Sequence, residues 1–105
     1  KKKLSKHDNG ALYDAVVPKS NPAKPIGEWD HFRITCKGPM VIVVLNGEEI
    51  VKANLDNWTN GNRNPDGSRN KFKTALKDLP RKGHIGFQDH GHEVWFRNVY
   101  VKRLD

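Results

Sequence analysis

The chain has little cysteine, few apolar residues and no long hydrophobic run, and each shortage excludes a class of protein. Cys36 is the single cysteine in 105 residues, so an intrachain disulfide and a zinc site made of several thiolates are both excluded. The longest uninterrupted apolar run, Met40 to Leu45, is far too short to cross a bilayer, and no signal peptide opens the chain. Hydrophobic residues make up 35% of the sequence, which allows one domain with a modest core.

Positive charge is the one property present in excess, with a formal net charge of +7. Residues 61–82 carry seven basic and two acidic side chains, and residues 1–26 hold most of the remaining excess. A nucleic-acid-binding surface would interleave basic residues with exposed aromatics, whereas the lysines of 61–82 alternate with Asn, Asp, Gly and Pro. We therefore expect a solvated basic loop and no nucleic-acid partner, and we expect no membrane partner.

The middle of the chain has the alternation of a β-hairpin. Residues 29–36 alternate so that Phe32, Ile34 and Cys36 share one side, which should face the core. Residues 40–45 are rich in β-branched side chains, and residues 48–53 return as a partner strand. Between them, Asn46-Gly47 predicts a type I′ turn, because both central positions of that turn need positive φ.

The flanks of this hairpin are dominated by turn-forming residues. We expect residues 1–9 to form an exposed lead-in, residues 11–17 one short strand, and the proline-rich residues 18–25 a surface crossing. Residues 56–82 predict one long loop, of a length that is often functional, with a short helical turn within residues 71–79 as an option.

The last part of the chain predicts two more strands. Residues 84–90 and 93–102 both alternate, the second with two partly buried faces as in a central strand, and Gly91-His92 forms the corner between them. Five or six strands with hairpins at regular spacing predict an all-β fold, an antiparallel β-sandwich or barrel.

The corner at residues 88–93 is the strongest candidate for chemistry. His90 and His92 are two residues apart, a spacing that suits a pair of divalent-metal ligands or an acid–base pair, and both interpretations remain open. Gln88 would share a strand face with His90, beside Gly86, whose missing side chain would admit a ligand. A plain solvated polar face is the alternative.

Other candidate chemistries have less support in the sequence. No pair of carboxylates suits an ordinary glycosidase, and Asp89 falls on the presumed core side, where pairing with Arg97 is expected. Cys36 is expected to fill core volume. Of the three tryptophans, Trp58 lies in the irregular region and is the one we predict to stack on a sugar.

Four motifs occur in one order along the chain: Gly10-Ala-Leu-Tyr13, Gly27-Glu-Trp-Asp30, Leu45-Asn-Gly47, and Gly83-His-Ile-Gly-Phe-Gln-Asp-His-Gly91 followed by Phe96-Arg-Asn-Val99. This ordered set resembles the 3-keto-disaccharide hydrolase family, formerly a domain of unknown function, over nearly the whole chain from Gly10 to Leu104. The resemblance implies a jelly-roll sandwich of the concanavalin A-like lectin and glucanase type.

The resemblance also implies an activity, which is the cleavage of glycosides already oxidised at C3. The ketone acidifies the C2 proton, so elimination followed by hydration can replace direct hydrolysis. Such chemistry needs a base at C2, an acid at the leaving oxygen, and polar or metal stabilisation of an enolate. On this basis we predict His90 and Gln88 as catalytic and His92, Arg97, Asn98 and Trp58 as substrate-binding residues.

The resemblance covers only the C-terminal portion of the family's single β-sandwich domain. Family members carry further upstream strands, one with a Glu-Val-Gln-type motif, that nothing in residues 1–105 matches, and the chain has no initiator methionine. We therefore expect a fragment or processed product, with another chain or chain segment supplying the missing strands. Family members are mostly bacterial and exported, so the predicted location is periplasmic or extracellular. A non-catalytic, lectin-like carbohydrate-binding module is the alternative function.

Overall fold

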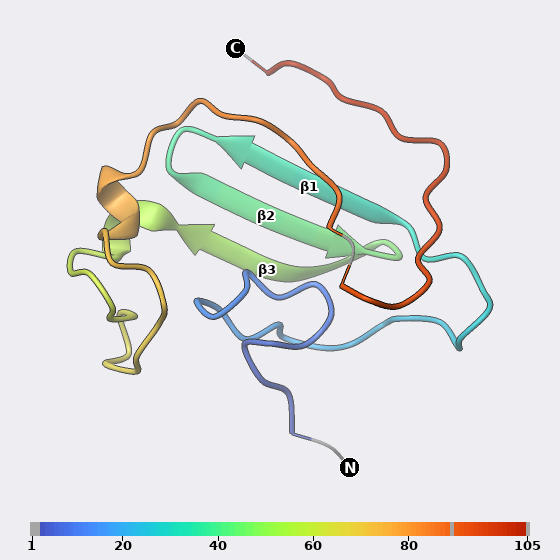
Figure 1. Cartoon of the computed structure of the whole chain (residues 1–105), viewed down its shortest axis with the longest axis horizontal. Coiled ribbons are helices and arrows are strands. Elements are labelled where there is room, and N and C mark those ends of the chain that lie inside the picture. The colour runs from blue at the N-terminus through green and yellow to red at the C-terminus, as the bar shows by residue number, and fades with distance from the viewer. Residues whose placement is uncertain (1–2, 89, 105) are drawn as a thin grey trace.

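A computed structural model describes residues 3–88 and 90–104 of the chain, and its regular structure is one antiparallel sheet. The three strands run in the order β1 (Phe32–Lys37), β2 (Met40–Leu45) and β3 (Glu48–Asn54) (Figure 1). Two short 3₁₀ helices follow, η1 (Leu55–Asn57) and η2 (Leu76–Asp78). The predicted all-β antiparallel fold class is confirmed, and no helix of the described residues could span a membrane.

Both turns of the sheet are tight. Residues 38–39 join β1 to β2, and Asn46 and Gly47 join β2 to β3, so that Leu45 pairs directly with Glu48. The φ angles of Asn46 and Gly47 are 50° and 83°, as a type I′ turn requires. The hairpin predicted from the Asn-Gly pair is therefore confirmed.

Asn46 also holds the loop that precedes β1. Its Oδ1 accepts a hydrogen bond from the His31 amide (2.9 Å), and its Nδ2 donates to the Pro22 carbonyl (2.9 Å) and to Asp30 Oδ1 (2.8 Å). The Lys24 amide donates to the same Asp30 oxygen, and these hydrogen bonds lower the pKa of the Asp30 carboxyl. One turn residue thus fixes both the hairpin and the segment beside it.

A β-bulge in β3 determines which of its side chains are buried. Val43 pairs with Val51 but Val44 pairs with Glu49, which leaves Ile50 as the extra residue opposite the β2 ladder. Ile50 and Val51 are both fully buried, although a regular strand would place neighbours on opposite faces. The bulge therefore adds one large side chain to a small core.

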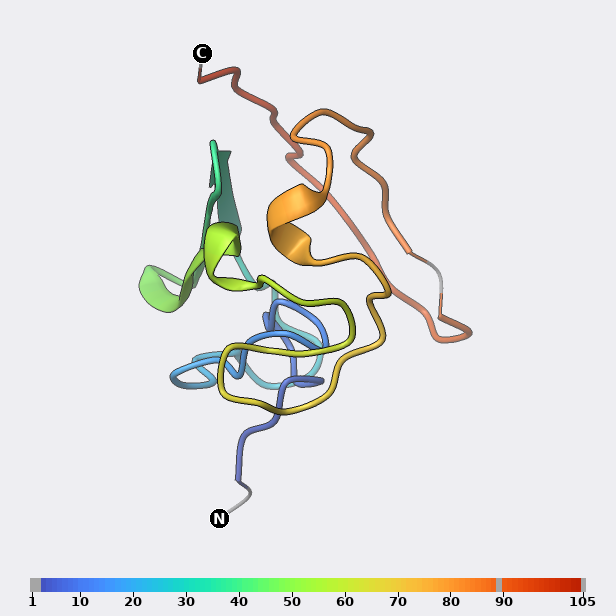
Figure 2. The ribbon, with the colours of Figure 1, turned by 90° about the vertical axis from the view of Figure 1, so that its left-hand side faces the viewer.

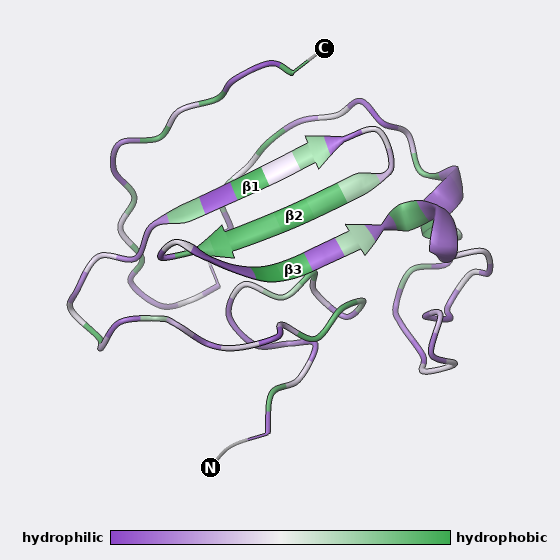
Figure 3. Cartoon of the chain, turned by 180° about the vertical axis from the view of Figure 1, so that it is seen from behind, coloured by the Kyte–Doolittle hydropathy of each residue, from purple (hydrophilic) through white to green (hydrophobic). Residues whose placement is uncertain are grey.

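The core lies on one face of β2 and β3. The N-terminal segment and the loop around η1 and η2 cover that face, while the other face, seen in Figure 3, is crossed by no other part of the backbone. The Lys19 amide donates to the Ile50 carbonyl (2.8 Å), which ties the proline-rich segment to β3 as a surface crossing. The buried members of the core are Ala15, Val43, Leu45, Ile50, Val51, Ala53, Trp58 and Leu76.

β1 differs from its prediction. Phe32, Ile34 and Cys36 were expected to face the core, yet all three are exposed, and Ile34 retains 63% of its accessible surface. Phe32 and Ile34 lie across the ladder from the core residues Leu45 and Val43, but the covering segments pack over β2 and β3 and leave the β1 edge open. The prediction that Cys36 fills core volume is likewise wrong.

The C-terminal part of the chain departs most from the sequence pattern. Residues 84–90 and 93–102 were predicted as strands, but the described residues of 82–104 belong to none, and Figure 2 shows the segment standing away from the sheet that it crosses in the view of Figure 1. Its large apolar side chains are exposed, including those predicted to be half-buried. An alternating segment becomes a strand only when a neighbouring strand accepts and donates its backbone hydrogen bonds, and here three strands form in place of five or six.

The N-terminal segment has less strand structure than predicted, and its lead-in contacts the rest of the protein. Residues 11–17 contain a single bridge, between Leu12 and Val16, in place of a strand. Within the lead-in, His7 Nε2 lies 2.8 Å from Asp14 Oδ1, and the Lys71 amide donates to Asp14 Oδ2 (2.7 Å). Asp14 therefore connects the lead-in to the long loop.

We expect Ile50→Ala to lower the free energy of unfolding by about 2–5 kcal/mol, because it removes a fully buried side chain from a small core. Ile34→Ala is the matched control on the open strand and should change stability by about 0.5 kcal/mol or less. Urea unfolding followed by tryptophan fluorescence measures both. Equal losses for the two variants would contradict the placement of the core.

A second prediction concerns acid stability. The hydrogen bond with His7, followed by those from Lys71 and Lys6, lowers the pKa of Asp14 below its ordinary value of 3.8. A lowered pKa in the folded state stabilises the fold above the ordinary value, and that contribution is lost as pH falls through the folded value. Asp14→Asn, which tolerates the positive φ of this position, should therefore flatten the fall of the unfolding midpoint below about pH 4.

The control for this measurement is Asp78→Asn, whose side chain pairs only with its exposed neighbour Lys77. Its acid profile should match that of the unsubstituted chain. A profile for Asp14→Asn that also matches would show that the Asp14 contacts contribute nothing to acid stability.

Candidate functional site

The predicted corner closes around a glycine. Gly91 has a φ of 84°, a conformation that L side chains rarely adopt, and the chain reverses there. On either side of the corner, the rings of Phe87 and Phe96 pack with centroids 4.4 Å apart and an interplanar angle of 43°. This tilted pair brings the two arms of the C-terminal segment together.

The two arms enclose a pocket of about 330 Å³. It combines an apolar wall of aromatic and valine side chains with an amide, an imidazole and a carboxylate. Its lining residues are Phe87, Gln88, His92, Glu93, Val94 and Phe96. A mixed lining of this kind suits a sugar ring, which has apolar C–H faces and a rim of hydroxyl groups.

The polar groups of this pocket differ in whether their hydrogen-bonding atoms are already used. The Glu93 carboxylate accepts a hydrogen bond from the indole nitrogen of Trp95, so one of its oxygens is occupied. The Gln88 amide can both donate and accept, and the His92 imidazole can do the same in its neutral form. The corner therefore offers two groups that can contact the hydroxyl or keto oxygens of a ligand.

The structure brings together some of the predicted site residues and not others. Gln88 and His92 line the same pocket, whereas His90 is exposed at the corner between them and is not part of the lining. The prediction that Gln88 pairs with His90 on one strand face required a strand that does not form. Asp89, expected to pair with Arg97, lies outside the described residues.

Arg97 and Asn98 lie on the second arm. The Arg97 guanidinium carbon is 4.0 Å from the centroid of the Trp29 ring, a cation–π contact that ties the C-terminal segment to the loop before β1. Asn98 is exposed and has a φ of 52°, which marks a local bend. Both residues are near the corner in sequence, but neither lines the pocket.

The prediction that Trp58 stacks on a sugar is not supported. Trp58 retains 5% of its accessible surface, and its Nε1 donates a hydrogen bond to Asn64 Oδ1 (2.8 Å) inside the protein. Its position in an irregular segment suggested exposure, but the segment folds back and buries it. The ring face is therefore unavailable to a ligand.

The residues that the structure describes do not form a binding site for a divalent metal. Residues 3–88 and 90–104 contain no group of three or more His, Cys, Asp and Glu side chains close enough to bind one. His90 and His92 together would supply two ligands, and a catalytic zinc site usually has three from the protein. The described residues therefore do not fit a metal centre.

Two contacts of the site were absent from the sequence predictions. Glu93 is not among the predicted site residues, although its position directly after His92 places it at the corner. The pairing of Trp29 with Arg97 joins residues nearly 70 positions apart, and no pattern in the sequence indicates it.

Comparisons with known proteins agree with this fold and with the family resemblance. Residues 1–102 match the model of the 3-keto-α-glucoside-1,2-lyase-like domain. A curated protein of Bacteroides thetaiotaomicron named 3-keto-disaccharide hydrolase is 35% identical over 98% of this chain, which spans 39% of that protein.

A solved structure shows the same relationship. The crystal structure of a protein from Parabacteroides distasonis with the provisional name glycosyl hydrolase superposes with a TM-score of 0.65 and 35% sequence identity. The superposition covers 69% of this chain and 38% of the other. The chain thus spans about two fifths of the length of both relatives, and it belongs to the family of 3-keto-α-glucoside-1,2-lyase-like domains.

Proposed function

We propose that this chain is part of an enzyme that cleaves 3-keto-glycosides, and that the corner at residues 88–93 holds the reacting sugar. The observation that carries the proposal is that Gln88 and His92 line one pocket and bracket His90 in the chain. The family of the domain and the name of the curated relative support the same substrate class.

The proposed reaction is an elimination followed by addition of water. A base removes the proton on C2, the electron pair forms the C1–C2 double bond, and the C1–O bond breaks. The leaving oxygen takes up one proton from an acid, so the two proton transfers balance. Water then adds across the double bond to give the free 3-keto sugar.

The corner residues suit these steps by their chemistry. Histidine has an ordinary pKa near neutrality and can both accept and return a proton, which is the role we assign to His90. The Gln88 amide would donate a hydrogen bond to the 3-keto oxygen, where negative charge develops as C2 loses its proton. His92 would bind a hydroxyl group, while the apolar wall of Phe87 and Phe96 faces the C–H side of the ring.

The carboxylates described at the corner also favour a reaction in which histidine, and not a carboxylate pair, transfers the protons. An ordinary glycosidase places two carboxylates on either side of the bond that breaks. Among the residues that the structure describes, one carboxylate lines the corner pocket, that of Glu93, and it already accepts a hydrogen bond from Trp95. An activated C2–H bond removes the need for the second carboxylate.

We also infer that strands from outside residues 1–105, in the same polypeptide or in another, complete the sandwich. Large apolar side chains occupy residues 94–96 and 99–101 and are exposed, and the outer edge of β1 has no pairing partner among the described residues. Strands laid against these surfaces would bury them. As part of the same proposal, the enzyme lies in the periplasm or outside the cell, which cell fractionation tests.

The test is turnover of a 3-keto-glucoside by the complete polypeptide that contains this chain. His90→Ala should lower kcat/KM by about 10²–10⁴-fold, the usual contribution of a general acid or base. Exchange of the C2 proton in deuterated water should fall with it, because both measurements depend on the same proton removal.

The matched control is His84→Ala, which removes an exposed histidine from the same segment outside the pocket lining. It should retain the activity of the unsubstituted protein. Unchanged turnover in His90→Ala with a large loss in His92→Ala would transfer the proton-transfer role to His92. Binding of glycosides without turnover of any 3-keto-glycoside would favour the lectin-like module and overturn the proposal.

A further inference from the structure

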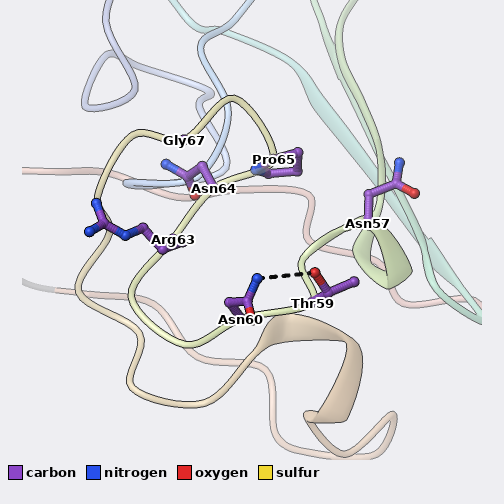
Figure 4. Close-up of a pocket in the computed structure, with 7 residues that line it drawn as sticks. All are labelled: Asn57, Thr59, Asn60, Arg63, Asn64, Pro65 and Gly67. Carbon is purple, nitrogen blue, oxygen red and sulfur yellow. Dashed lines mark hydrogen bonds between the residues drawn. The ribbon is translucent and has the colours of Figure 1, made fainter.

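A second pocket lies in the long loop after β3. It has a volume of about 390 Å³ and shares no residue with the corner pocket. Figure 4 shows Thr59 and Asn60 facing Asn64 and Pro65 across it, with Arg63 on one flank. Its volume falls within the range of small-molecule sites, about 300–1,000 Å³. Its full lining is Asn57, Thr59, Asn60, Arg63, Asn64, Pro65 and Gly67.

The base of this loop pocket is fixed by one buried amide. Asn64 Oδ1 accepts hydrogen bonds from Trp58 Nε1 and Asn70 Nδ2, both at 2.8 Å. Asn64 Nδ2 donates to the Asp14 carbonyl (3.2 Å) and to Ser68 Oγ (3.0 Å). Every hydrogen-bonding position of this side chain is therefore used inside the protein, and the amide acts as a rigid support rather than as a ligand contact.

The backbone around the pocket is also held in place. The Asn62 amide donates to the Phe72 carbonyl and the Asn70 amide to the Asn62 carbonyl, while a turn closes from the Gly67 amide to the Asn64 carbonyl. At Gly61 a Cβ atom would lie 2.0 Å from the Lys73 carbonyl oxygen, so only glycine fits this close approach. The long loop is thus a folded frame, and the pocket exists before a ligand arrives.

The side chains that face the pocket from this frame are polar and available. Among the described residues, the Asn57 side chain has no hydrogen-bond partner, and that of Asn60 has a single long one, from Nδ2 to Thr59 Oγ1 (3.4 Å). The Arg63 guanidinium has no hydrogen-bond or carboxylate partner in residues 3–88 and 90–104. Within residues 3–88 and 90–104, no acidic side chain lines the pocket.

We propose that this pocket binds an acidic sugar unit, a hexuronate residue of a polysaccharide or glycoside. The Arg63 guanidinium would hold the carboxylate through two parallel hydrogen bonds. Asn57, Asn60 and the Thr59 hydroxyl would pair with the sugar hydroxyls, because amides and hydroxyls both donate and accept. The net charge of +5 on residues 61–82, the loop that supplies most of the lining, attracts an anionic chain to this loop.

The lining argues against a nucleic-acid ligand for the same pocket. Single-stranded nucleic acids are bound by aromatic side chains on which bases stack. No aromatic residue lines the pocket, and the nearby Trp58 ring is buried. A carboxylated sugar needs one guanidinium and several amides, which is the set present.

The test compares methyl β-D-glucuronide with methyl β-D-glucoside, which differ only in the carboxylate at C6. In an ¹⁵N-resolved NMR titration of the full chain, the glucuronide should shift the amide signals of residues 57–67. It should bind about tenfold more tightly than the glucoside, the difference expected from a charge-assisted hydrogen-bonded pair. Arg63→Gln should remove that difference, and Arg33→Gln, an exposed arginine of β1, should leave it unchanged.

Each other result would overturn the proposal. Equal affinity for the two glycosides would show a neutral-sugar site, and acetate binding as tightly as the glucuronide would show an unspecific anion site. A tenfold preference that survives in Arg63→Gln would place the carboxylate elsewhere on the protein. No shifts of residues 57–67 with either sugar would show that the pocket binds neither. The corner variants do not affect this measurement, so its outcome is independent of the proposed 3-keto-glycoside activity.

Discussion

The fold depends on the burial of Ile50 at the bulge of β3. Because the bulge turns Ile50 and Val51 to the same side, β3 offers two adjacent large side chains to a core that has few others. The N-terminal segment closes over this point: the Cα of Gly10 lies so near Ile50 that an added Cβ would be 2.4 Å from Cδ1. The segments that carry the Asp14 contacts and the loop pocket are held against the sheet by this packing.

Local chemistry made the central hairpin predictable. An Asn-Gly pair between two β-branched segments has few alternatives to a type I′ turn, and the sequence contains the whole of that signal within residues 40–53. The proline-rich crossing was predictable for the same reason, whereas the helical turn within residues 71–79, where η2 forms, was only an option in the sequence. The ordered motifs identified the family because they depend on residue identity and not on burial.

Burial could not be predicted, because it depends on what lies opposite. The apolar side of β1 has the same alternation as a core strand, but no segment of the described chain covers Ile34 or Cys36. Trp58 looked exposed in a polar loop, but the loop folds back so that Asn64, six residues away, accepts the hydrogen bond of its indole nitrogen, and Asn70 donates to the same Asn64 oxygen. The strands expected in residues 84–102 need backbone partners that a single segment cannot provide. For the same reason the sequence could not show that Gln88 shares its pocket with His92 and not with His90.

Asn46 is both a turn residue and the hydrogen-bond partner of the preceding loop, and this double role limits how the hairpin can be reused. A designer who transplanted residues 40–53 into another sheet would carry over the turn geometry, but the amide would lose the Pro22, Asp30 and His31 contacts that it makes here. Conversely, replacing the turn by Gly-Gly would keep the positive φ angles and the backbone hydrogen bond to the His31 carbonyl, but it would remove the side-chain hydrogen bonds to the segment before β1. This hairpin therefore cannot be moved unchanged into another protein, because its turn also aligns the preceding loop with the sheet.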